Sequence, residues 1–412
     1  MKRRFVIAAG IATVTLAAIL LPVSQLGRGR VFRVDAPYPT ETKPQSKLWY
    51  AQDRWWAWLP DGTGGSIWKR GPAGWIRDVG CDAWVKDIPG YADVLADELG
   101  VFAVVVGSSQ LTFVRLTFRQ PEATYVPDGS PVVWRHQGDT AKSVGNPRWS
   151  SRPDAWNTEC ATIARDPQNH LWIAFDDQQQ VLVRRSADPL GREWSEVIPV
   201  SQSIDNDDLS VVFPLTDGVG VVWSDQTQDV LAFRRHIADR PPDEWEAIET
   251  IATGRSAAND HLSAAVASDG TVYLVTKNSR YVPGQPTLVL RVRNSGGDWT
   301  LFPFAAFSEE FTPSRPIVLT DPQANRLWIV HTSMDNSFRN SHGIVATPAD
   351  HRDIRLPDNG QLLITRRTDL QNATSGKGRL PEGVPGIVLA SDRLGNVYEG
   401  ILPISETAES EP

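Results

Sequence analysis

The sequence is poor in cysteine, methionine and charge. Among 412 residues there are 2 Cys and 2 Met, and Asp, Glu, Lys and Arg together make up 22%. The two cysteines are far apart and no Cys/His zinc spacing occurs, which excludes a thiolate metal site. The low charge excludes a long charged helical rod or coiled coil. The sequence also contains no Gly-rich phosphate loop and no Ser-His-Asp arrangement.

Apolar residues and tryptophan are well represented. An apolar content of 41% is ample for a buried core, so the body of the chain is not disordered. The 16 Trp are spread along the chain, which suggests a residue used once or twice in each structural repeat.

Residues 1–30 have the composition of an export segment. They contain five basic residues, no acidic residue and an apolar run at 5–21. This pattern predicts a signal peptide or an uncleaved anchor, and because no clean cleavage site follows we favour an anchor helix with its positive end in the cytoplasm. The rest of the protein is then exported, either anchored outside the cytoplasmic membrane or secreted.

The remaining chain is acidic. Without residues 1–30 it has 36 basic against 49 acidic residues, a net charge of −13, which disfavours nucleic acid and anionic lipid as partners. Both Cys81 and Cys160 lie in this exported part, where disulfides persist. We expect a disulfide between them, the alternative being two buried free thiols.

One unit recurs along the chain: a short apolar strand, an Asp with Gly or Asn close behind, and a second strand with an aromatic residue. Asp, Asn and Gly close tight turns, so each unit predicts a β-hairpin. The clear copies are residues 163–174, 214–223, 266–275, 318–330 and 389–398, and the weaker ones are 53–58 and 95–102.

The spacing of the units predicts a β-propeller. Their Asp residues, at 53, 97, 166, 217, 269, 321 and 392, are 44, 69, 51, 52, 52 and 71 residues apart, a period near fifty with two long insertions, which fits four-stranded blades. A third strand with a basic residue and a fourth opened by Trp follow most hairpins. We predict an all-β propeller of seven blades over 31–404, with six or eight as alternatives. An N-terminal hydrophobic helix precedes it, and a flexible acidic tail follows at 405–412.

The last copy leaves only two strands for the final blade. Residues 31–45 precede the first copy and are expected to supply an outer strand, which ties the two ends of the chain together.

Two stretches resemble the sialidase-like, Asp-box (BNR) propellers. Residues 222–245 are similar to one blade, and Ser186-Ala187-Asp188-Pro189-Leu190-Gly191-Arg192-Glu193-Trp194 is similar to the Ser-x-Asp-x-Gly-x-x-Trp box with one extra residue. The resemblance covers about residues 155–305, and it implies a turn that locks the third and fourth strands away from any active site. The family's Phe/Tyr-Arg-Ile-Pro motif is matched only by Phe32-Arg33-Val34-Asp35, without the Pro, and its nucleophilic Tyr–Glu pair cannot be assigned, so no catalytic residue is carried over.

Strand order predicts which face carries function. In a blade of strands A to D, the D–A and B–C connections share one face, and here they carry most of the polar residues. Loops held on a rigid scaffold are the usual place for function. We therefore expect the site on this face. The catalytic candidates are Asp208, Asp260 and His261, and the ligand-binding candidates are Asp177, Asp225, Arg280, Tyr281, Arg315, His331 and Arg339.

These residues fit more than one chemistry. Paired carboxylates at the channel mouth suit glycoside cleavage. Asp205, Asp207 and Asp208 are hard-oxygen ligands for Ca²⁺, although the Gly and spaced Glu of a helix–loop–helix calcium site are missing. The same residues also suit ordinary loops that cap strand ends.

The sequence thus predicts an extracytoplasmic binding module for a glycan or a protein partner. A sialidase-like glycoside hydrolase and an accessory subunit of a membrane complex are the alternatives.

Overall fold

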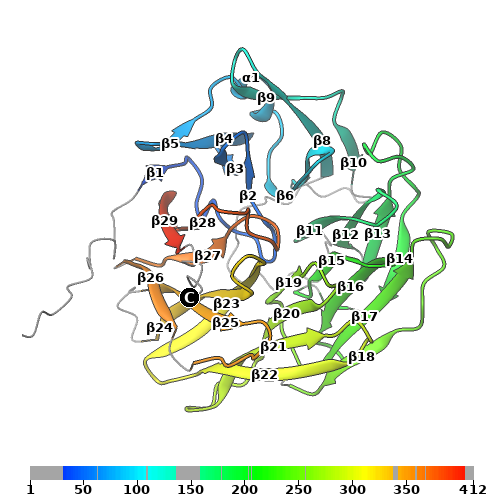
Figure 1. Cartoon of the computed structure of the whole chain (residues 1–412), viewed down its shortest axis with the longest axis vertical. Helices are drawn as coiled ribbons and strands as arrows, with labels where there is room; N and C mark the ends of the chain where they lie inside the picture. The colour runs from blue at the N-terminus through cyan, green and yellow to red at the C-terminus, as the bar shows by residue number, and fades with distance from the viewer. Residues whose placement is uncertain are drawn as a thin grey trace, which may run out of the picture.

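The protein is a ring of seven β-sheets. The computed structural model describes residues 31–62, 64–107, 110–135, 158–177, 179–202, 204, 205, 207–255, 257–336, 342–357, 360–366 and 368–403. In these residues the strands form seven separate sheets, which are arranged around a central channel like the blades of a propeller (Figure 1). The predicted seven-bladed all-β fold is confirmed.

The first three blades follow one another in chain order. Blade 1 contains β2 (Leu48–Ala51), β3 (Arg54–Asp61), β4 (Gly64–Gly71) and β5 (Gly74–Arg77). A one-turn helix, α1 (Asp82–Val85), leads to blade 2, which contains β6 (Tyr91–Asp97), β7 (Gly100–Val106), β8 (Gln110–Arg119), β9 (Thr124–Pro127) and β10 (Val132–Arg135). Blade 3 contains β11 (Ala161–Arg165), β12 (Leu171–Asp177), β13 (Gln180–Arg185) and β14 (Ile198–Gln202). Blade 2 is widened because β9 and β10 both pair with β8.

The next three blades have four strands each. Blade 4 contains β15 (Ser210–Leu215), β16 (Gly218–Asp225), β17 (Val230–Ile237) and β18 (Glu249–Thr253). Blade 5 contains β19 (Leu262–Val266), β20 (Val272–Lys277), β21 (Pro286–Arg293) and β22 (Trp299–Ala306). Blade 6 contains β23 (Phe311–Asp321), β24 (Arg326–Asp335), β25 (His342–Asp350) and β26 (Gln361–Arg366).

Blade 7 joins the two ends of the described chain. It contains β27 (Gln371–Thr374), β28 (Gly386–Ser391), β29 (Asn396–Leu402) and, as its outer strand, β1 (Phe32–Arg33), which pairs antiparallel with β29 (Figure 1). The expected closure by an N-terminal strand is confirmed. The Phe32 ring lies 4.4 Å from the Trp68 ring of blade 1 and makes the closing strand part of a buried cluster.

The expected strand order in blade 7 is wrong by one strand. The Asp392 turn links β28 to β29, the second and third strands, whereas the other six repeat Asp residues lie at turns between first and second strands. The innermost strand is β27, whose sequence Gln-Asn-Ala-Thr lacks the apolar pattern that marks the other inner strands.

The repeat Asp residues act as turn closers. Asp166 accepts hydrogen bonds from the backbone N–H groups of Gln168 and His170, at 2.9 and 2.8 Å, and from the indole of Trp172 at 2.9 Å. These bonds fix both the turn and the Trp on the second strand. Trp172, Trp223 and Trp328 are all buried on second strands, so their predicted packing role is confirmed.

The box at 186–194 forms the turn between the third and fourth strands of blade 3. Asp188 accepts backbone N–H groups of Leu190, Arg192 and Glu193, and Ser186 bridges to Trp194. Gly191 adopts φ of +66°, and a Cβ there would lie 2.6 Å from the Phe113 ring, so only glycine fits. Trp194 precedes β14 and does not open it.

Polar side chains on inner strands tie neighbouring blades together. Each accepts a hydrogen bond from a backbone N–H that faces the channel, which satisfies the free edge of the next blade. The pairs are Asp93 with Ile163, Thr162 with Val212, Ser263 with Val318 and Thr374 with Lys47.

The chain between β1 and β2 crosses the central channel (Figure 1). We call residues 38–47 the channel segment. It is held by four blades through the following contacts: Thr40 with Ser391 and Lys47 with Thr374 in blade 7, Gln45 with the Tyr91 carbonyl in blade 2 and the Ala161 carbonyl in blade 3, and Lys43 with Asp260, which directly precedes β19 of blade 5. The channel segment therefore separates the two ends of the channel.

The predicted disulfide is wrong, because Cys81 and Cys160 are both buried free thiols. Cys81 packs between blades 1 and 2, with its sulfur 3.2 Å from the Tyr125 carbonyl, whereas Cys160 directly precedes β11, the inner strand of blade 3. Burial raises the pKa of Cys81 to about 12 and that of Cys160 well above its ordinary value, so both are unreactive thiols.

The predicted N-terminal helix at 1–30 and the tail at 405–412 lie outside the described residues. Within the described part of the chain, no helix has the length and apolar character needed to span a membrane.

Candidate functional site

Charged side chains from three consecutive blades lie within electrostatic range of Lys43 on the face formed by the D–A and B–C connections. Glu159 precedes β11 of blade 3, Asp207 precedes β15 of blade 4, and Asp260 precedes β19 of blade 5. Lys43 of the channel segment forms an ion pair with Asp260 and interacts electrostatically with Glu159 and Asp207. We call Glu159, Asp207, Asp260 and Lys43 the carboxylate cluster.

Two buried aspartates hold the cluster in place. Asp176, at the end of β12, accepts the backbone N–H groups of Glu159 and Cys160 at 3.0 and 3.1 Å. In the next blade, Asp208 accepts N–H groups of Asp205 and Gln226 at 2.7 and 3.0 Å. In each blade a buried carboxylate thus joins the D–A and B–C connections and fixes the backbone of the cluster residue beside it.

The three carboxyl groups of the cluster differ in proton affinity. Burial raises the pKa of Glu159 to about 8, against the attraction of Lys43 and with the help of the negative charges on Asp207 and Asp260. Reduced hydration and the charge of Asp260 raise the pKa of Asp207 to about 6. Burial also tends to raise the pKa of Asp260, but His261 and Lys43 hold that pKa well below its ordinary value. At neutral pH the cluster therefore holds a protonated Glu159 beside ionised Asp207 and Asp260.

His261 connects Asp260 to Ser314 of blade 6. Its Nδ1 lies 2.6 Å from an Asp260 carboxylate oxygen, and its Nε2 lies 3.3 Å from Ser314 Oγ. This is the order of a Ser-His-Asp triad, which the sequence did not reveal because Ser314 is 53 residues from His261. Ser314 is only 2% exposed, so the chain of hydrogen bonds positions Asp260 and does not present a nucleophile to substrate.

A second group of residues borders the cluster. Arg315 has φ of +52° at a bulge in β23, and it interacts with Glu41, Asp260, Tyr38 and Tyr281. Tyr281 is 52% exposed and accepts a hydrogen bond from Lys277 Nζ at 2.8 Å. An exposed aromatic residue, Tyr281, and one carboxylate of the cluster, Asp260, therefore both lie within electrostatic range of Arg315.

Other predicted residues have structural positions. Asp208 is fully buried and acts as the brace described above. Asp225 is buried and closes its turn by accepting the Gln228 N–H at 2.8 Å. His331 is buried in β24, and burial lowers its pKa to about 4, so it is a neutral core histidine.

Three further candidates are less informative. Asp177 ends β12 and is half-buried, and Arg280 is exposed in the B–C connection of blade 5. Arg339 lies outside the described residues.

The predicted calcium ligands are not gathered into a site. In the described part of the chain no group of three or more His, Cys, Asp or Glu side chains is arranged to hold a metal ion. Asp205 and Asp207 are exposed, whereas Asp208 is turned into the protein as a hydrogen-bond acceptor.

The sequence candidates did not include Glu159, Lys43 or Glu41. Glu159 lies in a D–A connection, so the rule that selected Asp260 could also have selected Glu159. Lys43 and Glu41 carry no local signal, because only the closed ring brings the N-terminal segment into the channel.

Comparison with known proteins does not assign the chain to a family. No protein-family model and no curated protein matches the chain. Among solved structures, the polysaccharide lyase Uly1 is 10% identical over 89% of this chain and 91% of its own, with a TM-score of 0.46. The GH93 α-L-arabinofuranosidase of Fusarium graminearum is 12% identical over 79% of this chain and 99% of its own, with a TM-score of 0.46. Regucalcin from Agrobacterium tumefaciens is 12% identical over 74% and 88%, with a TM-score of 0.39.

Similarities at this level do not assign an activity to the chain. The fold itself defines the class as a seven-bladed β-propeller. The predicted membership of the Asp-box family stays a prediction.

Proposed function

We propose that this propeller is a carbohydrate-active enzyme that cleaves a glycosidic bond at the carboxylate cluster. The observation that carries the proposal is that Glu159, Asp207 and Asp260, from three consecutive blades, all interact electrostatically with Lys43. Glycoside cleavage needs one carboxylic acid that is protonated and one that is ionised at the same pH, and neighbouring environments that separate their pKa values supply such a pair.

The roles follow from the proton affinities. Glu159, with a pKa raised to about 8, acts as the general acid and donates its proton to the oxygen of the leaving group. Asp207, ionised above about pH 6, removes a proton from the attacking water. Asp260 remains ionised beside Lys43 and His261, and its negative charge adds to burial and to the charge of Asp207 in holding the proton on Glu159.

Sugar recognition is assigned to the border of the cluster. The Lys277 ammonium lies over one face of the exposed Tyr281 ring, 4.9 Å from its centroid, and also donates a hydrogen bond to its hydroxyl. We assign the opposite face of this ring to a pyranose or furanose ring. Arg315 supplies hydrogen-bond donors next to Asp260.

Glycan binding without cleavage is the second candidate. It is favoured by the Lys43–Asp260 ion pair, which places an ammonium group within the cluster and neutralises one of its charges. A binding module needs Tyr281 and Arg315 but does not depend on the proton carried by Glu159.

The test is hydrolysis of a panel of aryl glycosides and plant and bacterial polysaccharides. Wild type is compared with Glu159→Gln and with the matched control Glu244→Gln, an exposed residue of the turn between β17 and β18 on the opposite face. We expect cleavage of at least one substrate, with a loss of about 10²–10⁴-fold in Glu159→Gln and none in the control. Equal activity in all three proteins would contradict the proposal. Glycan-array binding that Tyr281→Ala abolishes, without any cleavage, would select the second candidate.

Export and anchoring through residues 1–30 are a separate proposal, supported by the basic and apolar pattern of that segment. N-terminal sequencing of the protein recovered from the membrane fraction tests it. A chain beginning at Met1 indicates an anchor, a chain beginning near residue 30 indicates cleavage, and recovery in the cytoplasm contradicts export.

A further inference from the structure

A cavity lies at the end of the channel opposite the carboxylate cluster. Its volume is about 390 Å³, within the range of small-molecule sites. It is lined by the ends of the inner strands β6, β11, β15, β19 and β23, which lie at the turns between first and second strands. Pro44, Gln45 and Ser46 of the channel segment also line it, so this segment stands between the cavity and the carboxylate cluster.

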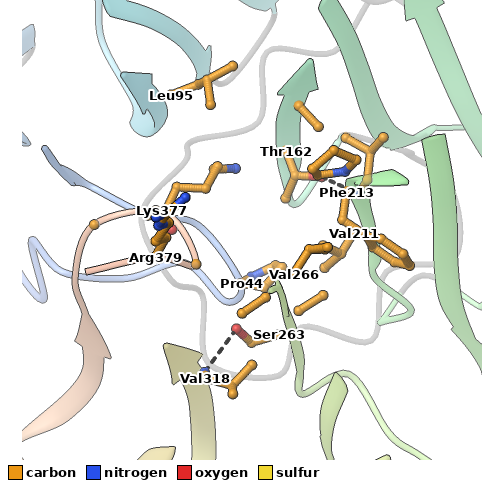
Figure 2. Close-up of a pocket in the computed structure, with 18 of the residues that line it drawn as sticks. Pro44, Leu95, Thr162, Val211, Phe213, Ser263, Val266, Val318, Lys377 and Arg379 are labelled. Carbon is orange, nitrogen blue, oxygen red and sulfur yellow. Dashed lines mark hydrogen bonds between the residues drawn. The ribbon is translucent and has the colours of Figure 1, made fainter. Parts of the chain in front are cut away.

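The wall of the cavity is mostly apolar. Val211, Phe213 and Val266 lie on one side, while Lys377 and Arg379, from the connection between β27 and β28, lie on the other (Figure 2). Apolar side chains gain by excluding water but offer no directional contacts.

Three polar side chains of the wall form hydrogen bonds within the protein. Thr162 Oγ1 accepts the Val212 N–H at 3.0 Å and Ser263 Oγ accepts the Val318 N–H at 3.4 Å (Figure 2). Gln45 donates to two backbone carbonyls. A sugar, which needs many hydrogen bonds, therefore finds few partners among these side chains.

The charged side chains of the wall differ in whether they have a partner within the protein. Arg165 pairs with Asp97 at 2.6 Å, and Lys377 pairs with Asp93. Arg379 is exposed, and its guanidinium has no hydrogen bond or ion pair to any residue that the structure describes. Its backbone is nevertheless fixed, because Gly378 and Leu380 on either side exchange hydrogen bonds with Thr320 at 2.7 and 2.9 Å.

We propose that this cavity binds an aliphatic carboxylate, with the hydrocarbon chain against the apolar wall and the carboxylate on Arg379. The apolar wall accounts for the hydrocarbon chain, the hydrogen bonds that already engage Thr162 and Ser263 disfavour a sugar, and the unpaired guanidinium favours an anion. This site is independent of the proposed glycoside cleavage, since the channel segment lies between the two.

The test is isothermal titration calorimetry with sodium decanoate, and with decan-1-ol as the uncharged probe. Wild type is compared with Arg379→Gln, with Val266→Trp, which fills the cavity from a half-buried position, and with the control Arg393→Gln in the exposed β28–β29 turn. We expect decanoate to bind wild type and Arg393→Gln equally and at least tenfold more tightly than decanol. Arg379→Gln should weaken decanoate at least tenfold and leave decanol unchanged, and Val266→Trp should weaken both.

Three results would overturn the proposal: no decanoate binding to folded wild type, equal binding by Arg379→Gln, or equal binding by Val266→Trp. Circular dichroism melting establishes that each variant is folded. If Val266→Trp does not fold, Pro214→Trp replaces it, because Pro214 lines the same cavity at an exposed position.

Discussion

Lys43 of the channel segment forms an ion pair with Asp260 of blade 5, across 217 residues of sequence. The side chains are only 15% and 12% exposed, respectively, so the pair is largely withdrawn from water. This contact links the closure of the ring to the carboxylate cluster, because the segment that carries Lys43 runs directly from the closing strand β1 into the channel.

Removal of Lys43 should destabilise the protein and disturb the cluster. Lys43→Met leaves Asp260 charged and without its ammonium partner, at an expected cost of about 3 kcal/mol in the free energy of unfolding. Asp260→Asn in the Lys43→Met background should recover part of that loss, since it removes the unpaired charge. A double-mutant cycle by urea denaturation measures the coupling, and strictly additive effects would contradict a direct ion pair.

Glu159 should make stability depend on pH. The folded chain keeps its proton up to about pH 8, whereas the unfolded chain releases it near the ordinary value, so the folded state binds more protons between these limits. The stability that Glu159 contributes is therefore full below the unfolded pKa and is lost as pH rises toward 8.

The variant Glu159→Gln isolates this effect. Comparison with wild type is needed because Lys47, whose pKa burial lowers to about 7, contributes the opposite slope above that pH. Unfolding measured from about pH 5 to about pH 8 should show the variant gaining stability relative to wild type as pH rises. A difference that stays constant over this range would show that Glu159 is not protonated in the folded protein.

Phe32 should be essential to ring closure. It is 7% exposed and packs against Trp68 and Trp75 of blade 1, with ring centroids 4.4 and 5.8 Å away. Phe32→Ala should lower the free energy of unfolding by about 3 kcal/mol, whereas Arg33→Ala, at an exposed position in the same strand, should change little. Equal effects of the two substitutions in thermal or denaturant unfolding would mean that β1 does not close blade 7.

Both cysteines should be free thiols. Because Cys81 and Cys160 are buried, a thiol reagent should label the native protein slowly and the denatured protein at both positions without any reductant. Mass spectrometry of the alkylated protein counts the labels. A denatured protein that is labelled only after reduction would restore the disulfide that the sequence suggested.

The local part of this fold was open to prediction. Asp166 and Trp172 are six residues apart and are joined by a hydrogen bond of 2.9 Å, so the hairpin signal lies within one short stretch of sequence. The signal occurs seven times, and this repetition predicted the seven blades. The same reasoning misplaced the hairpin at Asp392, because the inner strand β27 is short and polar and has no periodic pattern of its own.

The candidate site was only partly open to prediction. Asp260 and His261 were predicted from their place in a D–A connection, and the same connections contain Glu159 and Asp207. Asp208, a catalytic candidate, proved to be a buried brace, which shows that position on the functional face does not decide the direction of a side chain. Lys43 was missed because its partner depends on the closed ring and not on any neighbour in sequence.

The pH dependence of kcat/KM, measured for wild type and Glu159→Gln on the best substrate of the panel, tests the proposed cleavage most directly. A protonated Glu159 and an ionised Asp207 predict a bell-shaped profile for wild type, with an acid limb at pH about 6 and an alkaline limb at pH about 8. In Glu159→Gln the rate should fall about 10²–10⁴-fold and the alkaline limb should disappear. A variant that keeps the wild-type rate and both limbs would contradict the assignment of Glu159 as the general acid.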